Sequence, residues 1–170
     1  MIDSPRLIQS TPNASWLPEG GTAEVWAGAE LEVPEPAVIV RLLLLREGGQ
    51  ELFCVRTEKG FDLPTLFLGG DGGWRSVAYG IGELTTRYLG HIAPVKCVGF
   101  VRNVVREADA AYRLPVPFAH VPVFTPTEPY AGWADLKGEG VWIGVADAPV
   151  LLSQRHWWPI ARVRLASRPG

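Results

Sequence analysis

The chain has 170 residues, 47% of them hydrophobic, and a formal net charge of −2 at pH 7. This length fits one domain with a core large enough to be stable alone. The charge supplies no basic field, which argues against binding to nucleic acid or to an anionic membrane. The sequence shows no signal-peptide pattern and no apolar run long enough to span a bilayer, so we expect a cytoplasmic protein. Cys54 and Cys97 lack metal-binding spacing and are interpreted as buried apolar residues.

The first third of the chain predicts an arm followed by paired strands. Residues 1–36 are interrupted by proline and glycine. We interpret them as an N-terminal arm that adds strands to a sheet edge, contacts a second copy in a homodimer, or packs onto its own domain. The run 37–46 is almost entirely apolar and predicts one strand buried on both faces. Residues 47–50 predict a hairpin turn, and 51–56 predict the returning strand.

A glycine-rich turn and one helix follow within residues 61–90. Asp71 is the predicted N-cap of the helix, and Gly90 lies where a glycine commonly ends one. Two glycines inside the helix, Gly80 and Gly82, indicate that the helix backbone lies in close contact with a neighbour. An apolar stripe at spacings of four, three and four predicts the buried face, which consists of Val77, Ile81, Leu84 and Tyr88.

Strands dominate the next part of the chain. Residues 95–106 predict a long strand in which Gly99 marks either a bulge or the close approach of a neighbour. The prolines in 114–124 predict an edge strand, because proline cannot donate a hydrogen bond to a central ladder. A short strand is predicted at 141–145.

The chain is predicted to finish with a helix that is capped by Asp147 and ended or kinked by Pro159. The order of elements predicts an α/β (α+β) domain over residues 37–165, with a mixed sheet sandwiched between helices. Residues 166–170 are a predicted tail.

Within residues 61–90 the sequence resembles the signature of the Nudix hydrolase superfamily, G-x5-E-x7-R-E-U-x-E-E-x-G-U, where U is a bulky aliphatic residue. Gly82-Glu83-Leu84 lies where that signature has Arg-Glu-aliphatic. Thr86 and Arg87 occupy the two glutamate positions that follow, and Trp74 stands at the upstream glutamate position. The resemblance is therefore to a degenerate form of the signature.

Two further features are similar to Nudix chains. Phe61-Asp62-Leu63-Pro64 is similar to the aromatic-x-Leu-Pro segment that leads into the signature. The order of predicted elements over 37–160, including the late Trp157-Trp158-Pro159, is also similar. Together these features imply a Nudix-like fold.

The resemblance implies a hydrolase of nucleoside diphosphate-linked compounds that uses magnesium bound by helix glutamates. Mg²⁺ takes oxygen ligands from carboxylates and substrate phosphates, and it shields the phosphate charge. Glu83 is the remaining helix glutamate, as a metal ligand or general base, and it can alternatively form a helix-face ion pair with Arg87. Because Arg87 places a cation where the family has an anion, we expect the activity to be weak or absent, as in a pseudoenzyme.

Other residues are candidates for ligand binding. Arg56, by resemblance, contacts phosphate, and Arg87 can clamp a phosphate with its planar fork, although a solvated strand end and an ion pair are the plainer interpretations. Three aromatic residues are candidates for stacking on a base, if they do not simply pack in the core: Phe61, Trp74 and Trp133. Five other carboxylates could rebuild a metal site, unless they serve as caps, turn residues or surface groups: Asp62, Asp71, Glu107, Asp109 and Glu128.

Three hypotheses about function follow. The first is a Nudix-like hydrolase of weak or absent activity, with Glu83 in the site. The second is a non-catalytic module that binds a nucleotide or other anionic ligand through Arg56 and Arg87. The third is a structural protein that dimerises through its N-terminal arm. A carboxylate cluster around Glu83 would favour the first, an open pocket lined by Arg and Trp the second, and a filled pocket the third.

Overall fold

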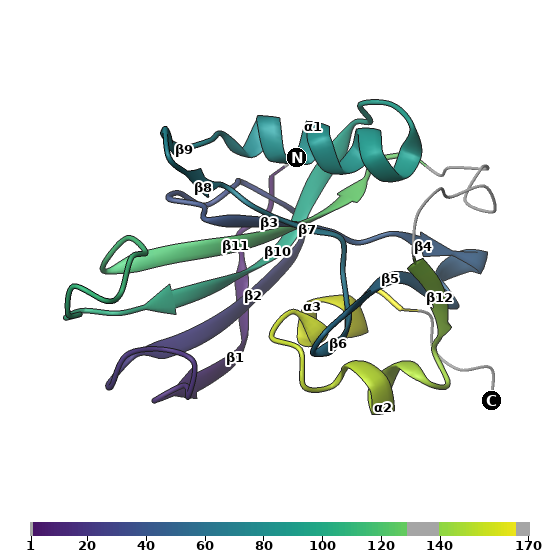
Figure 1. The fold of residues 1–170 in the computed structure, drawn as a ribbon. Coiled ribbons are helices and arrows are strands. Elements are labelled where there is room, and N and C mark those ends of the chain that lie inside the picture. The colour runs from purple at the N-terminus through teal and green to yellow at the C-terminus, as the bar shows by residue number, and fades with distance from the viewer. Residues whose placement is uncertain (1, 129–139, 166–170) are drawn as a thin grey trace.

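The computed structural model of the chain describes residues 2–128 and 140–165. In this part of the chain the largest element is a six-stranded sheet (Figure 1). Its strands lie in the order β1 (Arg6–Pro12), β2 (Thr22–Leu31), β10 (Val95–Val104), β11 (Phe118–Pro126), β3 (Ile39–Leu42) and β7 (Thr65–Phe67). The sheet is mixed, because β11 and β3 run parallel while the other neighbours are antiparallel.

A second sheet, of four strands, is built around β5 (Glu51–Thr57), and its other strands are β12 (Gly140–Gly144), β4 (Leu45–Arg46) and β6 (Gly60–Asp62). Three short elements form turns, namely the 3-10 helix η1 (Glu47–Gly49) and the paired β8 (Gly69–Gly70) and β9 (Gly73–Trp74). The helices of the described residues are α1 (Val77–Leu89), α2 (Ala148–Leu152) and α3 (Trp158–Arg162).

Helices cover both faces of the large sheet. α1 contacts β3 and β7, while α3 contacts β2 and β10, and Figure 1 shows α1 on one side with α2 and α3 on the other. One buried cluster contains Leu84 and Tyr88 of α1, and the other contains Trp157 and Ile160. The predicted α+β architecture, a mixed sheet between helices, is confirmed. No helix within the described ranges is long and apolar enough to cross a membrane.

α1 begins and ends at local signals. The hydroxyl of Ser76 accepts a hydrogen bond from the Tyr79 backbone N–H at 3.1 Å, so the N-cap is Ser76. The prediction of Asp71 as N-cap is wrong, because Asp71 lies in the exposed turn between β8 and β9. Gly90 ends the helix with a φ of 84° and donates to the carbonyl of Thr86, as predicted. The predicted apolar stripe faces the core.

The two glycines inside α1 have different surroundings. A Cβ atom at Gly80 would lie 2.7 Å from the Leu68 side chain and 2.8 Å from that of Val40, whereas one at Gly82 would meet nothing within 4 Å. A close neighbour of the helix backbone is therefore present at Gly80, as predicted. The prediction is wrong at Gly82.

The apolar run 37–46 is not the single strand that was predicted. It divides into β3 of the large sheet and β4 of the small one, with Leu43 and Leu44 fully buried between them. The run crosses between the sheets, and this explains why it is almost entirely apolar. The predicted hairpin after it is confirmed, because β4 pairs antiparallel with β5 across η1.

β11 lies between β10 and β3, so the prediction of an edge strand is wrong. Two of the prolines precede the strand and one, Pro122, lies inside it. The pairing register shifts next to this proline, because Ala37 lies opposite His120 whereas Arg41 lies opposite Val123. The interior proline therefore lies at an irregular point of the ladder, where a strand tolerates a residue that lacks an N–H donor.

Other predictions about the strands are confirmed. The register of β10 shifts between Cys97 and Gly99, which is the predicted bulge. Cys54 and Cys97 are buried and unpaired. Burial raises the pKa of the Cys54 thiol to about 12 and that of Cys97 to about 11, so both thiols stay protonated and unreactive.

The two ends of the domain also differ in detail from expectation. The predicted final helix is two short helices, and Pro159 lies in the first turn of α3 instead of ending a helix. Asp147 precedes α2, but its side chain makes no capping hydrogen bond. Within the N-terminal arm, β1 and β2 belong to the large sheet, where β2 pairs with β10.

Candidate functional site

A pocket of about 240 Å³ lies between the C-terminal half of α1 and the segments of β5, β6 and β7. It brings together Arg56 and Arg87, which the sequence analysis proposed as ligand-binding residues from distant parts of the chain. The lining consists of Val55, Arg56, Thr57, Asp62, Leu63, Thr65, Arg87 and Tyr88.

Each of the two arginines lies over an aromatic ring. The Arg56 guanidinium carbon is 4.9 Å from the ring centroid of Phe61, and that of Arg87 is 5.3 Å from the ring centroid of Tyr88. Among the described residues, neither guanidinium forms an ion pair. Contact with a ring face restricts a guanidinium and leaves its in-plane N–H groups able to bond to an anion.

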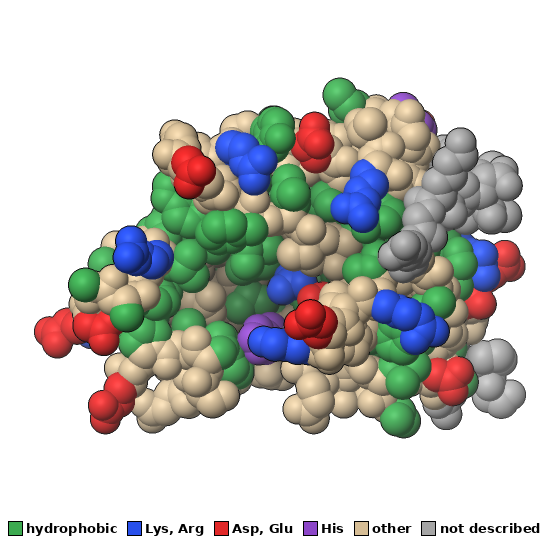
Figure 2. All heavy atoms as spheres, in the orientation of Figure 1, with side chains coloured by type: hydrophobic (Ala, Val, Ile, Leu, Met, Phe, Trp, Pro, Cys, Tyr) green, Lys and Arg blue, Asp and Glu red, His purple; other side chains and the backbone are tan. Residues whose placement is uncertain are grey.

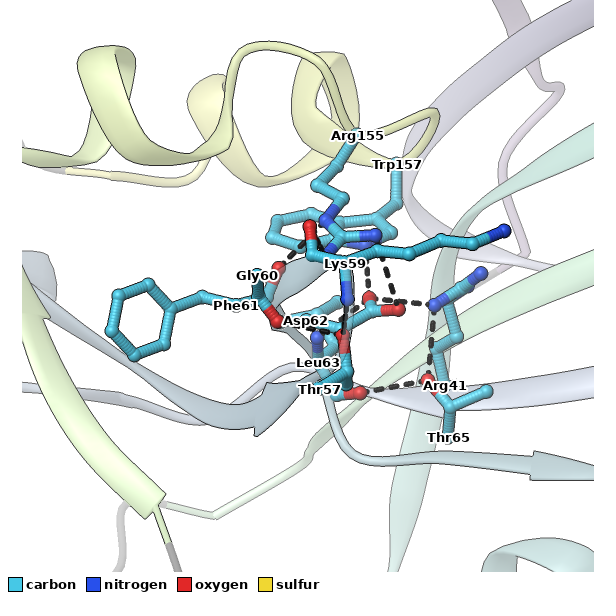
Figure 3. A network of polar contacts seen from close by, with 10 residues as sticks. All are labelled: Arg41, Thr57, Lys59, Gly60, Phe61, Asp62, Leu63, Thr65, Arg155 and Trp157. Atoms are coloured by element: carbon cyan, nitrogen blue, oxygen red, sulfur yellow. Dashed lines mark hydrogen bonds and ion pairs between the residues drawn. The ribbon is translucent and has the colours of Figure 1, made fainter.

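Asp62 connects the pocket to a polar network behind it, which Figure 3 shows. Its Oδ1 accepts hydrogen bonds from Arg41 Nη1 at 2.8 Å, from Trp157 Nε1 at 2.7 Å and from the Leu63 backbone at 2.8 Å. Its Oδ2 lies 3.7 Å from Arg155 Nη1. Asp62 therefore ties β3 and β6 to the segment between α2 and α3.

The network carries an excess of positive charge. Arg41 and Arg155 share the single carboxylate of Asp62. Burial lowers the pKa of the Arg41 guanidinium, Asp62 raises it again, and Arg155 lowers it. His156, whose ring stacks on Trp16 at 3.8 Å, has its pKa lowered by burial and then by the same two arginines. With Arg56 and Arg87 at the pocket, these cations favour an anionic ligand.

Figure 2 shows this face of the molecule as spheres. Basic, acidic and histidine side chains gather at a hollow between the layer of α1 and the layer of α2 and α3. Other basic and acidic side chains are scattered over the rest of this face.

Several predicted site residues lie elsewhere. Glu83 is exposed and does not line the pocket. The structure shows no ion pair between Glu83 and Arg87, so that prediction is wrong, and Arg87 lies over Tyr88 instead. Trp74 is 47% exposed and lines a different pocket, of about 540 Å³, at the start of α1. Trp133 lies outside the described residues.

The residues present do not fit the magnesium site that the resemblance implies. Within the described ranges, no three His, Cys, Asp or Glu side chains lie close enough together to hold a metal ion. Of the five carboxylates proposed to rebuild such a site, Asp62 lines the pocket, and its oxygens already bond to arginine, tryptophan and backbone donors. Mg²⁺ usually needs one or two carboxylates besides substrate phosphates, and this pocket offers none that is unengaged.

Sequence reasoning did not identify Arg41, Arg155 or Trp157 as part of the site. One signal was present, because Arg41 is the single charged residue that interrupts the apolar run 37–46 before its last position. A charge in a strand buried on both faces needs a partner, and Asp62 is that partner.

Comparison with solved structures finds proteins of similar fold. A Bacillus subtilis pyrophosphohydrolase, BsRppH in a mutant form, has 14% sequence identity and a TM-score of 0.50, with 92% of this chain and 95% of that chain covered. An ADP compounds hydrolase has 11% identity and a TM-score of 0.39, with 92% and 87% covered. No family model matches the chain, and no curated protein matches it. The likeness to the pyrophosphohydrolase shows that the chain has a Nudix-like α+β fold.

Proposed function

We propose that the chain is a Nudix-like domain that binds a small phosphate-containing ligand between Arg56 and Arg87, with weak or absent hydrolysis. The observation that carries the proposal is the pair of arginines, each over its own aromatic ring, in one pocket. Arginine forks match phosphate geometry, and charge-assisted hydrogen bonds of this kind are about twice as strong as neutral ones.

The size of the pocket indicates which part of the ligand it can hold. Its volume of about 240 Å³ is below the roughly 300–1,000 Å³ of sites for drug-sized molecules. It suits a phosphate or diphosphate group, with the rest of the ligand extending over the surface. A nucleoside diphosphate or a related compound has this shape.

The expectation of weak hydrolysis rests on the oxygen atoms near the pocket. Hydrolysis of a diphosphate needs a base or metal that positions the attacking water. Asp62 accepts three hydrogen bonds and faces two arginines, so its oxygen atoms are engaged with protein donors and are not placed to position a water molecule. Glu83, the candidate base and metal ligand, is exposed outside the pocket. The arginines can bind the ligand, but no described residue is placed to activate water beside them.

Calorimetric titration with inorganic pyrophosphate and with ADP tests the binding. We expect Arg56→Gln and Arg87→Gln each to weaken binding by about tenfold to a hundredfold, because a hydrogen bond to a charged group contributes about 1.5–3 kcal/mol. Arg106→Gln changes an exposed arginine just after β10 and is the matched control. Equal affinities for the wild type and both pocket variants would contradict the proposal.

A phosphate-release assay on ADP-linked compounds, with Mg²⁺ or Mn²⁺, tests the second half of the proposal. We expect turnover that is absent or close to the uncatalysed rate. Rapid turnover that disappears in Glu83→Gln would show a working hydrolase and would overturn the assignment of weak activity.

A further inference from the structure

We propose that this pocket binds its phosphate ligand in the metal-free form, so that Mg²⁺ weakens binding instead of assisting it. The inference rests on the proposed function and deepens it. It starts from a disagreement: Arg87 stands at a helix position where the Nudix resemblance implies a metal-binding glutamate, and the structure places this guanidinium in the wall of the pocket.

The oxygen atoms of the pocket are already engaged. The Thr57 hydroxyl donates to the Gly60 carbonyl at 2.6 Å and accepts from the Lys59 backbone at 3.2 Å. The Thr65 hydroxyl donates to the Leu63 carbonyl at 2.7 Å and accepts from an arginine of the network behind it at 2.9 Å. Both threonine hydroxyls therefore have partners within the protein, and a divalent cation would have to break these bonds to gain ligands.

The carboxylate is engaged in the same way. Asp62 already compensates Arg41 and Arg155, which are 15% and 20% exposed. A metal that recruited Asp62 would leave two largely buried guanidinium groups without a counter-ion, which is costly. Among the described residues that line the pocket, there is no second carboxylate.

The arginine pair supplies what a metal would otherwise supply. Two guanidinium groups provide two positive charges and directed N–H donors, and their contacts with Phe61 and Tyr88 hold them in place before the ligand arrives. Magnesium bound to a diphosphate removes two negative charges from the ligand. It also sets a divalent cation close to Arg56 and Arg87, and like charges repel. The free anion is therefore the favoured ligand.

Calorimetry of the full chain with inorganic pyrophosphate tests this, once in EDTA and once in excess Mg²⁺. We expect binding in EDTA and a dissociation constant larger on the order of tenfold in Mg²⁺. Arg87→Gln loses most of the affinity in EDTA, and Arg106→Gln keeps it. Tighter binding in Mg²⁺ that still depends on Arg87 would overturn this inference and leave the proposed function standing. Absence of binding to the wild type in both buffers would overturn both.

A charge-reversed variant gives a second readout that does not depend on activity. Thr86→Glu with Arg87→Glu changes two exposed residues of α1, so the fold is expected to persist, and circular dichroism checks this. The variant should lose metal-free binding of pyrophosphate. Retained binding in EDTA would overturn the role assigned to Arg87, and Mg²⁺ binding by the wild type that depends on Glu83 would overturn the metal-free site.

Discussion

The Asp62 network offers the sharpest test of how the domain is held together. Replacing Asp62 by asparagine keeps the shape of the side chain and one acceptor oxygen but removes the negative charge. The Trp157 and Leu63 donors keep an acceptor, while Arg41 and Arg155 lose their counter-ion. The main effect is therefore electrostatic and falls on the two arginines.

The size of this effect follows from burial. Removing one partner of a fully buried ion pair costs about 3–5 kcal/mol. The carboxylate is 17% exposed, and the arginines are 15% and 20% exposed, so water screens part of the unpaired charge. We expect Asp62→Asn to lower the free energy of unfolding by about 2–3 kcal/mol. For a chain of this size this corresponds to a fall in Tm of about 4–12 °C.

Urea denaturation followed by circular dichroism measures the change. The matched control is Asp71→Asn, at an exposed turn residue between β8 and β9, which should change stability by less than about 0.5 kcal/mol. A double-mutant cycle with Arg41→Gln should give a coupling energy of about 1–3 kcal/mol. Equal stability changes for Asp62→Asn and Asp71→Asn would refute the view that Asp62 joins β3, β6 and the segment before α3.

Three further predictions concern α1, pH and the second pocket. Gly80→Ala should destabilise the protein by about 1 kcal/mol, because overpacking outweighs the gain in helix propensity, while Gly82→Ala should stabilise it by about 1 kcal/mol. Thermal unfolding of both variants measures these changes, and equal effects of the two substitutions would contradict the prediction. Burial first, and then the neighbouring arginines, lower the pKa of His156 in the folded state. The unfolded chain therefore binds the proton more readily, and stability falls as the pH drops below the unfolded pKa of about 6.5. His156→Gln should flatten this fall in denaturation curves at pH 7.5 and 5.5, and an unchanged slope would rule the histidine out as a contributor. Trp74→Ala should leave the affinity for pyrophosphate within about twofold of wild type, since Trp74 lies in a separate pocket. A larger loss of affinity in calorimetry would show that Trp74 contributes to binding the ligand.

Local signals explain which parts of the fold could be predicted. The end of α1 was predicted from Gly90 alone, because a left-handed residue at that place requires glycine or its few substitutes. Its beginning was not, since Asp71 and Ser76 are both good capping residues and the choice between them depends on the β8–β9 hairpin, whose turn contains Asp71. Local sequence therefore identifies candidate capping residues, and the pairing of neighbouring strands decides which of them caps the helix.

The errors in the sheets have a non-local cause. The proline in β11 indicated an edge strand by a rule that is sound for regular ladders. The rule failed because Pro122 lies where the register between β11 and β3 shifts, and β3 comes from a distant part of the sequence. The division of 37–46 between two sheets is similar, since an apolar run shows that residues are buried and does not show in which sheet.

The candidate site could be predicted only in part. Arg56 and Arg87 were proposed together for one anionic ligand, and both line one pocket in the structure. The contacts of Asp62 could not be predicted, because its partners come from distant segments and no periodicity links residues 41, 62 and 155. Glu83 was proposed from its place in a signature, yet it is exposed and does not line the pocket.

The contrast between Glu83 and Arg87 shows how fold and chemistry are specified by different residues. The apolar face of α1, with Leu84 and Tyr88, packs into the core and is sufficient to hold the helix in a Nudix-like fold. Its exposed face can change charge at small cost in stability, because surface substitutions are usually within about 0.5 kcal/mol. A cation at residue 87 is therefore compatible with the scaffold, and under our proposal it favours the metal-free phosphate anion over the magnesium-bound form. Fold similarity alone does not establish hydrolysis in this chain, and the charge on α1 is the property that experiments on its ligand should address first.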